Sequence, residues 1–264
     1  DELNHASIVE GRRLSFASYL KYKHNDMESL EAVLKKIPYE STKLIVMDGV
    51  FSMEGDIAKL PEIVALADKY NASVYVDEAH SLGVFGQEGR GICNHFGLTD
   101  RVDLIMGTFS KSLATIGGFI ATDAETINFL KHHSRSYIFS ASISPAATAS
   151  VIAALDVIKQ EPERIKNLWE ITNYSLSAFR SLGFEIGNTQ TPIIPLYIRD
   201  MDKTFAITQE LYEQGVFVNP VIPPACSPDD TLIRFSLMAT HTKAQIDEAV
   251  EKLTATFKKY EIIR

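Results

Sequence analysis

The chain is poor in the features that mark several common classes of protein. Its 264 residues include only two cysteines, Cys93 and Cys226, which cannot build the disulfide framework of a small secreted domain. No apolar run approaches the roughly 20 residues that cross a membrane as a helix. The net charge of −8 disfavours nucleic acid as a partner, because phosphates are repelled by an acidic surface. These absences favour a cytoplasmic protein.

Two chemical patterns are missing as well. The chain has no G-x-x-x-x-G-K-[ST] loop, which nucleoside triphosphatases use to hold phosphates. Four histidines, His24, His95, His132 and His133, lack the spacing of metal ligands, and we expect them to be solvated. We therefore expect no metal site.

The patterns that are present indicate an α/β protein. Short apolar runs alternate with helical patterns through the first two thirds, which favours a mostly parallel sheet with helices on both faces. Glu161-Pro162 interrupts two long helices, so we predict a large domain at 1–161 and a smaller α+β domain at 162–264. The expected helices are 27–36, 59–70, 124–133, 145–159, 163–182, 203–214 and 243–260. The expected strands or extended runs are 43–47, 73–76, 102–106, 118–121, 137–139, 193–198, 216–221 and 232–236.

Reactive side chains follow two of the predicted strands. The run 73–76 ends in Asp77-Glu-Ala-His80, and the run 102–106, expected to be a buried strand, leads to Lys111. Open α/β sheets hold their chemistry at the carboxyl ends of strands, so we expect these side chains to share one site. The alternative for each residue alone is a structural lysine or a helix cap.

An acid and a lysine at neighbouring strand ends suit pyridoxal phosphate. The acid can pair with the protonated ring nitrogen, and the lysine can form a Schiff base with the cofactor. The hydroxyls of Thr108 and Ser110 flank Lys111, and the backbone of such a turn suits a phosphate.

A second interpretation of Asp77-Glu-Ala-His80 is the DEAH motif of helicases, in which acids hold magnesium beside ATP. It requires the phosphate loop that this sequence lacks. A catalytically inactive scaffold is a third alternative, and the presence of Asp77, His80 and Lys111 argues against it.

Four ordered motifs give the whole chain a resemblance to the α-oxoamine synthases, which are fold-type-I pyridoxal-phosphate enzymes. They are Asn4-His-Ala-Ser7, Asp48-Gly-Val-Phe-Ser-Met-Glu-Gly-Asp56, Val76-Asp-Glu-Ala-His-Ser-Leu-Gly83 and Gly107-Thr-Phe-Ser-Lys-Ser112. In this family a substantial N-terminal portion precedes the first motif, so we expect the chain to be a fragment.

The resemblance implies a role for each matching residue that contacts the cofactor ring. Lys111 resembles the Schiff-base lysine, and Asp77 resembles the partner of the pyridinium nitrogen. His80 and Ser52 resemble donors to the phenolic oxygen of the cofactor. His5 resembles the imidazole that stacks on the ring, and it is also expected to orient the substrate carboxylate and assist a proton transfer.

The remaining roles concern the phosphate and the substrate. Thr108 and Ser110 match phosphate contacts, and the Ser140–Ser142 segment, with Ala141 at its centre, is expected to reach a phosphate across a homodimer interface. Arg234 matches the arginine that receives the substrate carboxylate, for which its forked guanidinium is suited.

The family joins an amino acid to an acyl-CoA thioester with loss of CO2. The segments 139–142, 216–220 and 232–242 most resemble the branch that condenses L-serine with palmitoyl-CoA, giving 3-ketodihydrosphingosine, the first step of sphingolipid synthesis. The branches that use glycine with acetyl-CoA, or L-alanine with a pimeloyl thioester, stay open as alternatives. Contact with a membrane surface is allowed, without a spanning segment.

Overall fold

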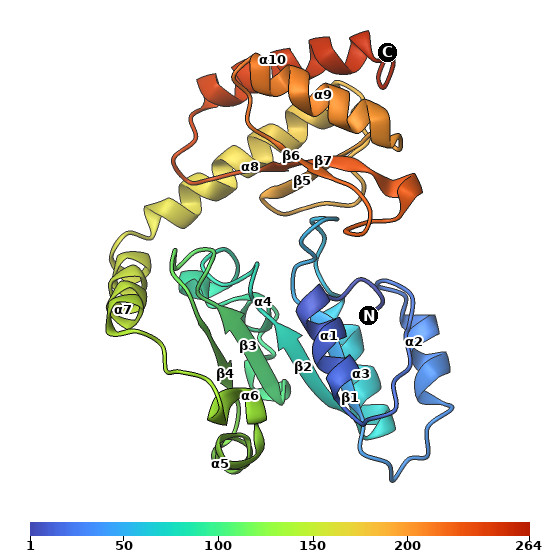
Figure 1. Ribbon diagram of the computed structural model, residues 1–264, viewed down its shortest axis with the longest axis vertical. Helices are drawn as coiled ribbons and strands as arrows, with labels where there is room; N and C mark the ends of the chain where they lie inside the picture. Colours follow the sequence, from blue (N-terminus) through green and yellow to red (C-terminus); the bar gives the residue numbers. More distant parts are fainter. The chain divides into compact units, whose positions relative to one another are not determined.

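The computed structural model describes residues 1–264 and divides into two compact units (Figure 1). Unit 1 comprises Asp1–Phe51 and Ala58–Pro162, and unit 2 comprises Ser52–Ile57 and Glu163–Arg264. Segment 52–57, which lies in the first predicted domain, therefore groups with unit 2. The domain boundary at 161/162 stays a prediction.

Unit 1 is built on a four-stranded sheet. Its strands are β1 (Leu44–Asp48), β2 (Ser73–Asp77), β3 (Leu104–Thr108) and β4 (Gly118–Ala121). The order is β1-β2-β3-β4, with β1, β2 and β3 parallel and β4 antiparallel to β3. The predicted α/β fold with a mostly parallel sheet is confirmed.

The helices of unit 1 begin where the sequence supplies capping groups. They are α1 (Ala6–Leu14), α2 (Met27–Leu34), α3 (Leu60–Tyr70), α4 (Ile92–His95), α5 (Ala124–His133), α6 (Arg135–Ile138) and α7 (Pro145–Gln160), with short 3₁₀ turns η1 (Gln87–Gly89) and η2 (Thr99–Arg101). Asp26 is the N-cap of α2 and accepts the N–H of Ser29 at 2.9 Å, and Asp123 and Ser144 cap α5 and α7 in the same way. Helix α3 packs against β2, and α2 covers α3.

Unit 2 is a smaller α+β unit with two layers, one of helices and one of strands. It contains α8 (Glu163–Ser181), β5 (Ile193–Tyr197), α9 (Met201–Glu213), β6 (Asn219–Val221), η3 (Pro228–Asp230), β7 (Leu232–Ser236) and α10 (Lys243–Lys259). The antiparallel order is β5-β7-β6, and α8, α9 and α10 form the layer beside this sheet (Figure 1). Phe179 lies at the centre of the core, with ring centroids of Phe184 and Phe235 at 5.1 and 5.2 Å.

The structure corrects three details of the predicted strands. Residues 137–139 are not extended, because the Phe139 N–H bonds to the Arg135 carbonyl and closes the one-turn helix α6. Strand β3 begins at Leu104 rather than Val102. The preceding Asp103 binds Val74 of β2 with its backbone N–H, which donates to the Val74 carbonyl at 3.0 Å, and with its carboxylate, which accepts the Val74 N–H at 2.7 Å. Only Asn219–Val221 of the predicted strand 216–221 pairs with a neighbour.

Two burial expectations are also wrong. Strand β3 is half-buried rather than buried, since α5, α6 and α7 bury none of their residues and leave this side of unit 1 open. His24 is not simply solvated. Its ring lies edge-on to Phe51 with centroids 4.4 Å apart, and its Nδ1 lies 3.1 Å from an Asp1 carboxylate oxygen.

Candidate active site

Three strands of unit 1 end in one row. The register pairs Asp48 with Asp77 across β1 and β2, and Asp77 with Met106 across β2 and β3. The Gly49 N–H donates to the Asp77 carbonyl at 2.8 Å, and the Glu78 N–H donates to the Met106 carbonyl at 2.7 Å. These bonds extend the ladder just past the strands, so that the residues that follow turn outward at a common edge.

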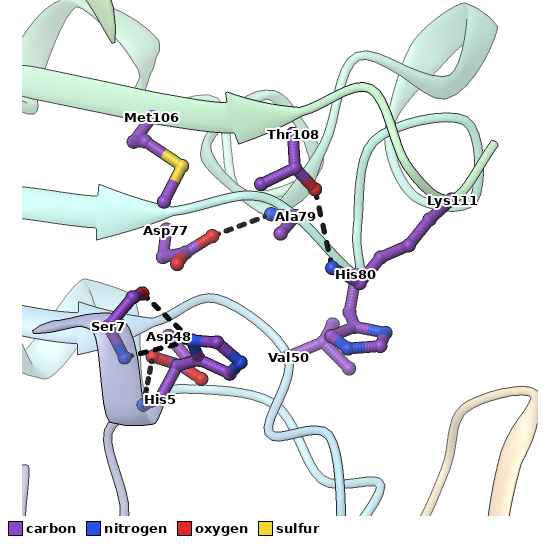
Figure 2. Close-up of a pocket in the computed structure, with 10 residues that line it drawn as sticks. All are labelled: His5, Ser7, Asp48, Val50, Asp77, Ala79, His80, Met106, Thr108 and Lys111. Atoms are coloured by element: carbon purple, nitrogen blue, oxygen red, sulfur yellow. Dashed lines mark hydrogen bonds between the residues drawn. The ribbon is translucent and has the colours of Figure 1, made fainter. Parts of the chain in front are cut away.

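Asp77 is a buried acid that retains an available oxygen. The residue is 4% exposed, and its Oδ1 accepts the Ala79 N–H at 2.8 Å. The other oxygen, Oδ2, has no hydrogen bond within the protein (Figure 2). Burial raises the pKa of this carboxyl, while the Ala79 N–H and the charges of His5 and Lys111 act in the opposite direction. Such a group is stabilised by any cationic partner that enters beside it.

Lys111 lies in a closed loop after β3. The Phe109 N–H donates to the Gly117 carbonyl, and the Thr115 N–H donates back to the Phe109 carbonyl, both at 2.9 Å. The Lys111 Nζ donates to Thr108 Oγ1 at 3.3 Å and is otherwise exposed. The lysine is therefore held by its loop and points toward the pocket from an open rim.

The turn between Asp77 and His80 is anchored by Glu78. This carboxylate is 1% exposed and accepts the N–H groups of Ile92 and Cys93 at 2.7 and 2.8 Å, together with the Ser81 hydroxyl. A Cβ at Gly91 would lie 2.5 Å from a Glu78 oxygen, so only glycine fits there. Glu78 thus anchors the turn to the start of α4, and His80, two residues later, is half-buried.

His5 reaches the same edge from α1. It is the N-cap residue of that helix, and its backbone N–H donates to Asp48 Oδ1 at 3.2 Å. Its ring lies beside the end of β1, with one ring nitrogen toward Ser7 (Figure 2).

These side chains surround one pocket within unit 1 (Figure 2). It is lined by His5, Ser7, Asp48, Val50, Asp77, Ala79, His80, Met106, Thr108 and Lys111. Five residues predicted from the sequence, His5, Asp77, His80, Thr108 and Lys111, are therefore brought together.

Four other predicted residues do not line this pocket. Ser110 and Ala141 are exposed on unit 1. Ser52 and Arg234 belong to unit 2, where the Arg234 Nη1 donates to the Ser52 carbonyl at 3.4 Å and its Nε donates to Ser236 Oγ at 3.1 Å. No acidic side chain pairs with Arg234, and burial lowers the pKa of its guanidinium. It is a half-buried cation without a counter-charge.

Asp48 and Ser7 line the pocket but were not among the sequence-predicted site residues. The signal for Asp48 is present in the sequence, since it ends an apolar run in the same way as Asp77. The signal for Ser7 is weaker, because its place depends on the start of a helix. No cluster of three or more histidine, cysteine or acidic side chains is arranged to hold a metal ion. No helix is both long enough and apolar enough to span a membrane.

The comparisons with known proteins agree with this geometry. The model of the family described as aminotransferase class I and II matches residues 1–253, and the chain therefore belongs to that family. Within it, the relatives are α-oxoamine synthases. The chain is 65% identical over 263 residues to a serine palmitoyltransferase of Bacteroides ovatus, covering 100% of this chain and 67% of that protein. It is 44% identical to an 8-amino-7-oxononanoate synthase of Thermosipho melanesiensis, with the same shares covered.

Solved structures give the same result. A serine palmitoyltransferase from S. paucimobilis, described with bound PLP–myriocin aldimine, superposes with a TM-score of 0.95 at 35% identity. The match covers 99% of this chain and 66% of that one. An 8-amino-7-oxononanoate synthase from Francisella tularensis gives a TM-score of 0.86 at 25% identity, with 100% and 75% covered. The chain thus spans about two thirds of the length of these curated relatives.

Proposed function

We propose that this chain forms part of a pyridoxal-phosphate-dependent acyltransferase. The reaction condenses L-serine with a long-chain acyl-CoA, palmitoyl-CoA, and gives 3-ketodihydrosphingosine, CoA and CO2. The observation that carries the proposal is the single pocket that combines Asp77, His80 and Lys111 with the imidazole of His5. An acid, a lysine and an imidazole around one cavity are the groups that this cofactor requires.

The residues present fit the cofactor. The free Oδ2 of Asp77 is suited to a protonated ring nitrogen, whose positive charge would offset the burial of the carboxylate. The Lys111 amine lies on the opposite rim of the pocket. Its one hydrogen bond, to Thr108 Oγ1, is long at 3.3 Å, so little is lost when the amine reacts with the cofactor. Thr108 offers a hydroxyl to the phosphate, with Ser110 and the Ser140–Ser142 segment as further contacts.

When bound, pyridoxal phosphate would withdraw electrons from the serine Cα and make its bonds easier to break. Lys111 would take up the Cα proton at Nζ, and Asp77 would hold the counter-charge for the ring. His5 would stack on the ring and orient the serine carboxylate. Arg234, which has no acidic partner in unit 2, is suited to receive that carboxylate with its fork.

The relatives favour the serine branch. Identity is 65% to the relative named serine palmitoyltransferase but 44% to the relative named 8-amino-7-oxononanoate synthase, over nearly the same residues. The family match also argues against the DEAH nucleoside triphosphatase considered from the sequence.

The same proposal includes a homodimer in the cytoplasm. Helices α5, α6 and α7 bury none of their residues within the chain, and Ile152 and Leu155 on α7 are 58% and 38% exposed. Exposed apolar side chains one turn apart on a helix are the kind of surface that a protein interface covers. Both cysteines are free thiols, which suits a reducing compartment.

Replacing Lys111 tests the assignment of the cofactor. Lys111→Ala should abolish the visible absorbance of the protein loaded with pyridoxal phosphate and reduce turnover by at least about 10³-fold, since both attachment and proton transfer are lost. Lys258→Ala, an exposed lysine of α10 in unit 2, is the matched control and should keep both. An unchanged absorbance band in Lys111→Ala would refute the proposal.

A titration with amino acids tests the branch. L-serine, but neither glycine nor L-alanine, should perturb the absorbance of the loaded protein. A response to glycine alone, or to L-alanine alone, would assign the chain to one of the other branches while leaving the cofactor assignment intact.

A further inference from the structure

His5 is held at two points. Its backbone N–H donates to Oδ1 of Asp48, a carboxylate that is 3% exposed. Its ring Nδ1 accepts the backbone N–H of Ser7 at 3.2 Å and lies 2.8 Å from the Ser7 hydroxyl oxygen. The bond to Asp48 positions the backbone of His5, and the contacts with Ser7 fix the orientation of its ring.

The second contact is an N-cap bond with an unusual acceptor. The side chain at an N-cap is usually a serine, threonine, aspartate or asparagine, whose oxygen accepts an N–H of the first helical turn. Here an imidazole nitrogen accepts that N–H, and the serine stands two residues later. The first turn of α1 therefore acts on the ring of a pocket residue.

The direction of these bonds selects one tautomer. A neutral imidazole carries one protonated and one bare nitrogen, and a backbone N–H can only donate. Nδ1 is consequently the bare nitrogen, and the Ser7 hydroxyl is placed to donate to it as well. The proton then lies on Nε2, which points away from Ser7 into the pocket (Figure 2).

We propose that Ser7 is a positioning residue that fixes the tautomer of His5, so that His5 presents an Nε2–H donor to the pocket. This inference rests on the proposed function, because His5 matters only if the pocket holds cofactor and substrate. It assigns to Ser7 a role that the motif alone does not supply.

Nitrogen NMR of histidine-labelled protein tests the tautomer without substrate. Spectra are recorded on the cofactor-free protein at a pH where titration shows the ring to be neutral, and His5→Gln assigns the signal. We expect Nδ1 to give the shift of a bare nitrogen and Nε2 that of a protonated one. Ser7→Ala keeps the backbone N–H but removes the hydroxyl, which is the closer of the two donors, so both shifts should move partway toward their average. Ser7→Thr should restore them. A proton on Nδ1 in the unmodified protein, or shifts unaffected by Ser7→Ala, would overturn the inference.

Steady-state kinetics tests the consequence. Ser7→Ala should lower kcat/KM by about fivefold, the change expected for one hydrogen bond of ~1 kcal/mol at 1.36 kcal/mol per tenfold. Ser7→Thr should retain most of the activity, and Ser15→Ala, at the other end of α1, is the matched control. Equal kcat/KM for Ser7→Ala and the control would refute the positioning role. If the protein turned over no L-serine at all, the proposed function would fail while the NMR result would still decide the tautomer.

Discussion

The two sides of unit 1 differ sharply in burial. The β1–β2 side has buried strands covered by α3 and α2, with Met47, Val76 and Leu60 fully enclosed. The β3–β4 side has half-buried strands, and its helices α5 to α7 bury nothing. The pocket lies where the sides meet, so that Asp77 comes from the buried side and Lys111 from the open one. The first side holds fully buried side chains, whereas the second leaves apolar side chains such as Ile152 and Leu155 exposed.

Truncating one leucine on each side should give the largest difference in the free energy of unfolding between the two sides. Leu60→Ala removes a fully buried side chain and should lower the free energy of unfolding by about 2–4 kcal/mol, from lost burial and the cavity that remains. Leu155→Ala, on the open side, should cost less than about 1 kcal/mol within one chain. Urea denaturation monitored by circular dichroism measures both.

Protein concentration provides the control for this pair. If α7 lies in a homodimer interface, the effect of Leu155→Ala should depend on protein concentration, while that of Leu60→Ala should change little. Equal, concentration-independent losses for the two variants would contradict the division into a buried and an open side.

Replacing Asp77 should change the stability less than Leu60→Ala does, and it should raise the stability rather than lower it. Its raised pKa means that the folded protein retains a proton that the unfolded chain releases, so stability falls as pH rises from the ordinary carboxyl value of about 4 to the raised value. Asp77→Asn keeps an acceptor for the Ala79 N–H and removes this loss. The cofactor-free variant should therefore melt at or above the temperature of the unmodified protein at pH 7.

The same variant should bind pyridoxal phosphate about 10–100-fold more weakly, the loss expected for one hydrogen bond between charged groups. Fluorescence titration with the cofactor measures this, and Asp202→Asn, which replaces an exposed acid of α9 in unit 2, is the control. A lower melting temperature together with unchanged cofactor affinity would show that Asp77 is purely structural.

The smallest change in stability should come from an exposed ion pair between α2 and α3. Glu31 on α2 accepts from Lys69 and Tyr70 on α3, and these bonds, led by Lys69, lower its pKa to about 2. The stabilisation is complete above the ordinary glutamate pKa and is lost as pH falls through the lowered one. Because the pair is exposed, Lys69→Met should reduce stability only slightly, and added salt should shrink the difference. Lys36→Met, without an acidic partner, is the control, and a large salt-independent loss would contradict this prediction.

Much of the site could be predicted because strand ends carry a strong local signal. Asp77 follows an apolar run directly, His80 and Lys111 lie in the turns that follow such runs, and parallel strands bring their carboxyl ends together. The helix caps Asp26, Asp123 and Ser144 also have a local signal in the sequence, because a cap bonds to residues next to it in the chain. Asp48 has the same strand-end signal as Asp77.

The remaining features depend on contacts between distant residues. Glu78 is adjacent to Asp77 in the sequence, but its task is to hold Ile92 and Cys93, and no local pattern reveals this. The run 137–139 has strand-forming residues yet forms a helical turn, because no neighbouring strand is available to pair with it.

The alternation of strands and helices and the chemical groups at the strand ends follow from local periodicity and residue type, so they could be predicted from the linear chain. Three features emerged only in the folded protein: β3 is half-buried, Asp77 keeps an oxygen without a hydrogen bond, and Ser7 orients the His5 ring. Burial and hydrogen-bond direction depend on which surfaces meet in space, and a linear pattern does not contain that information.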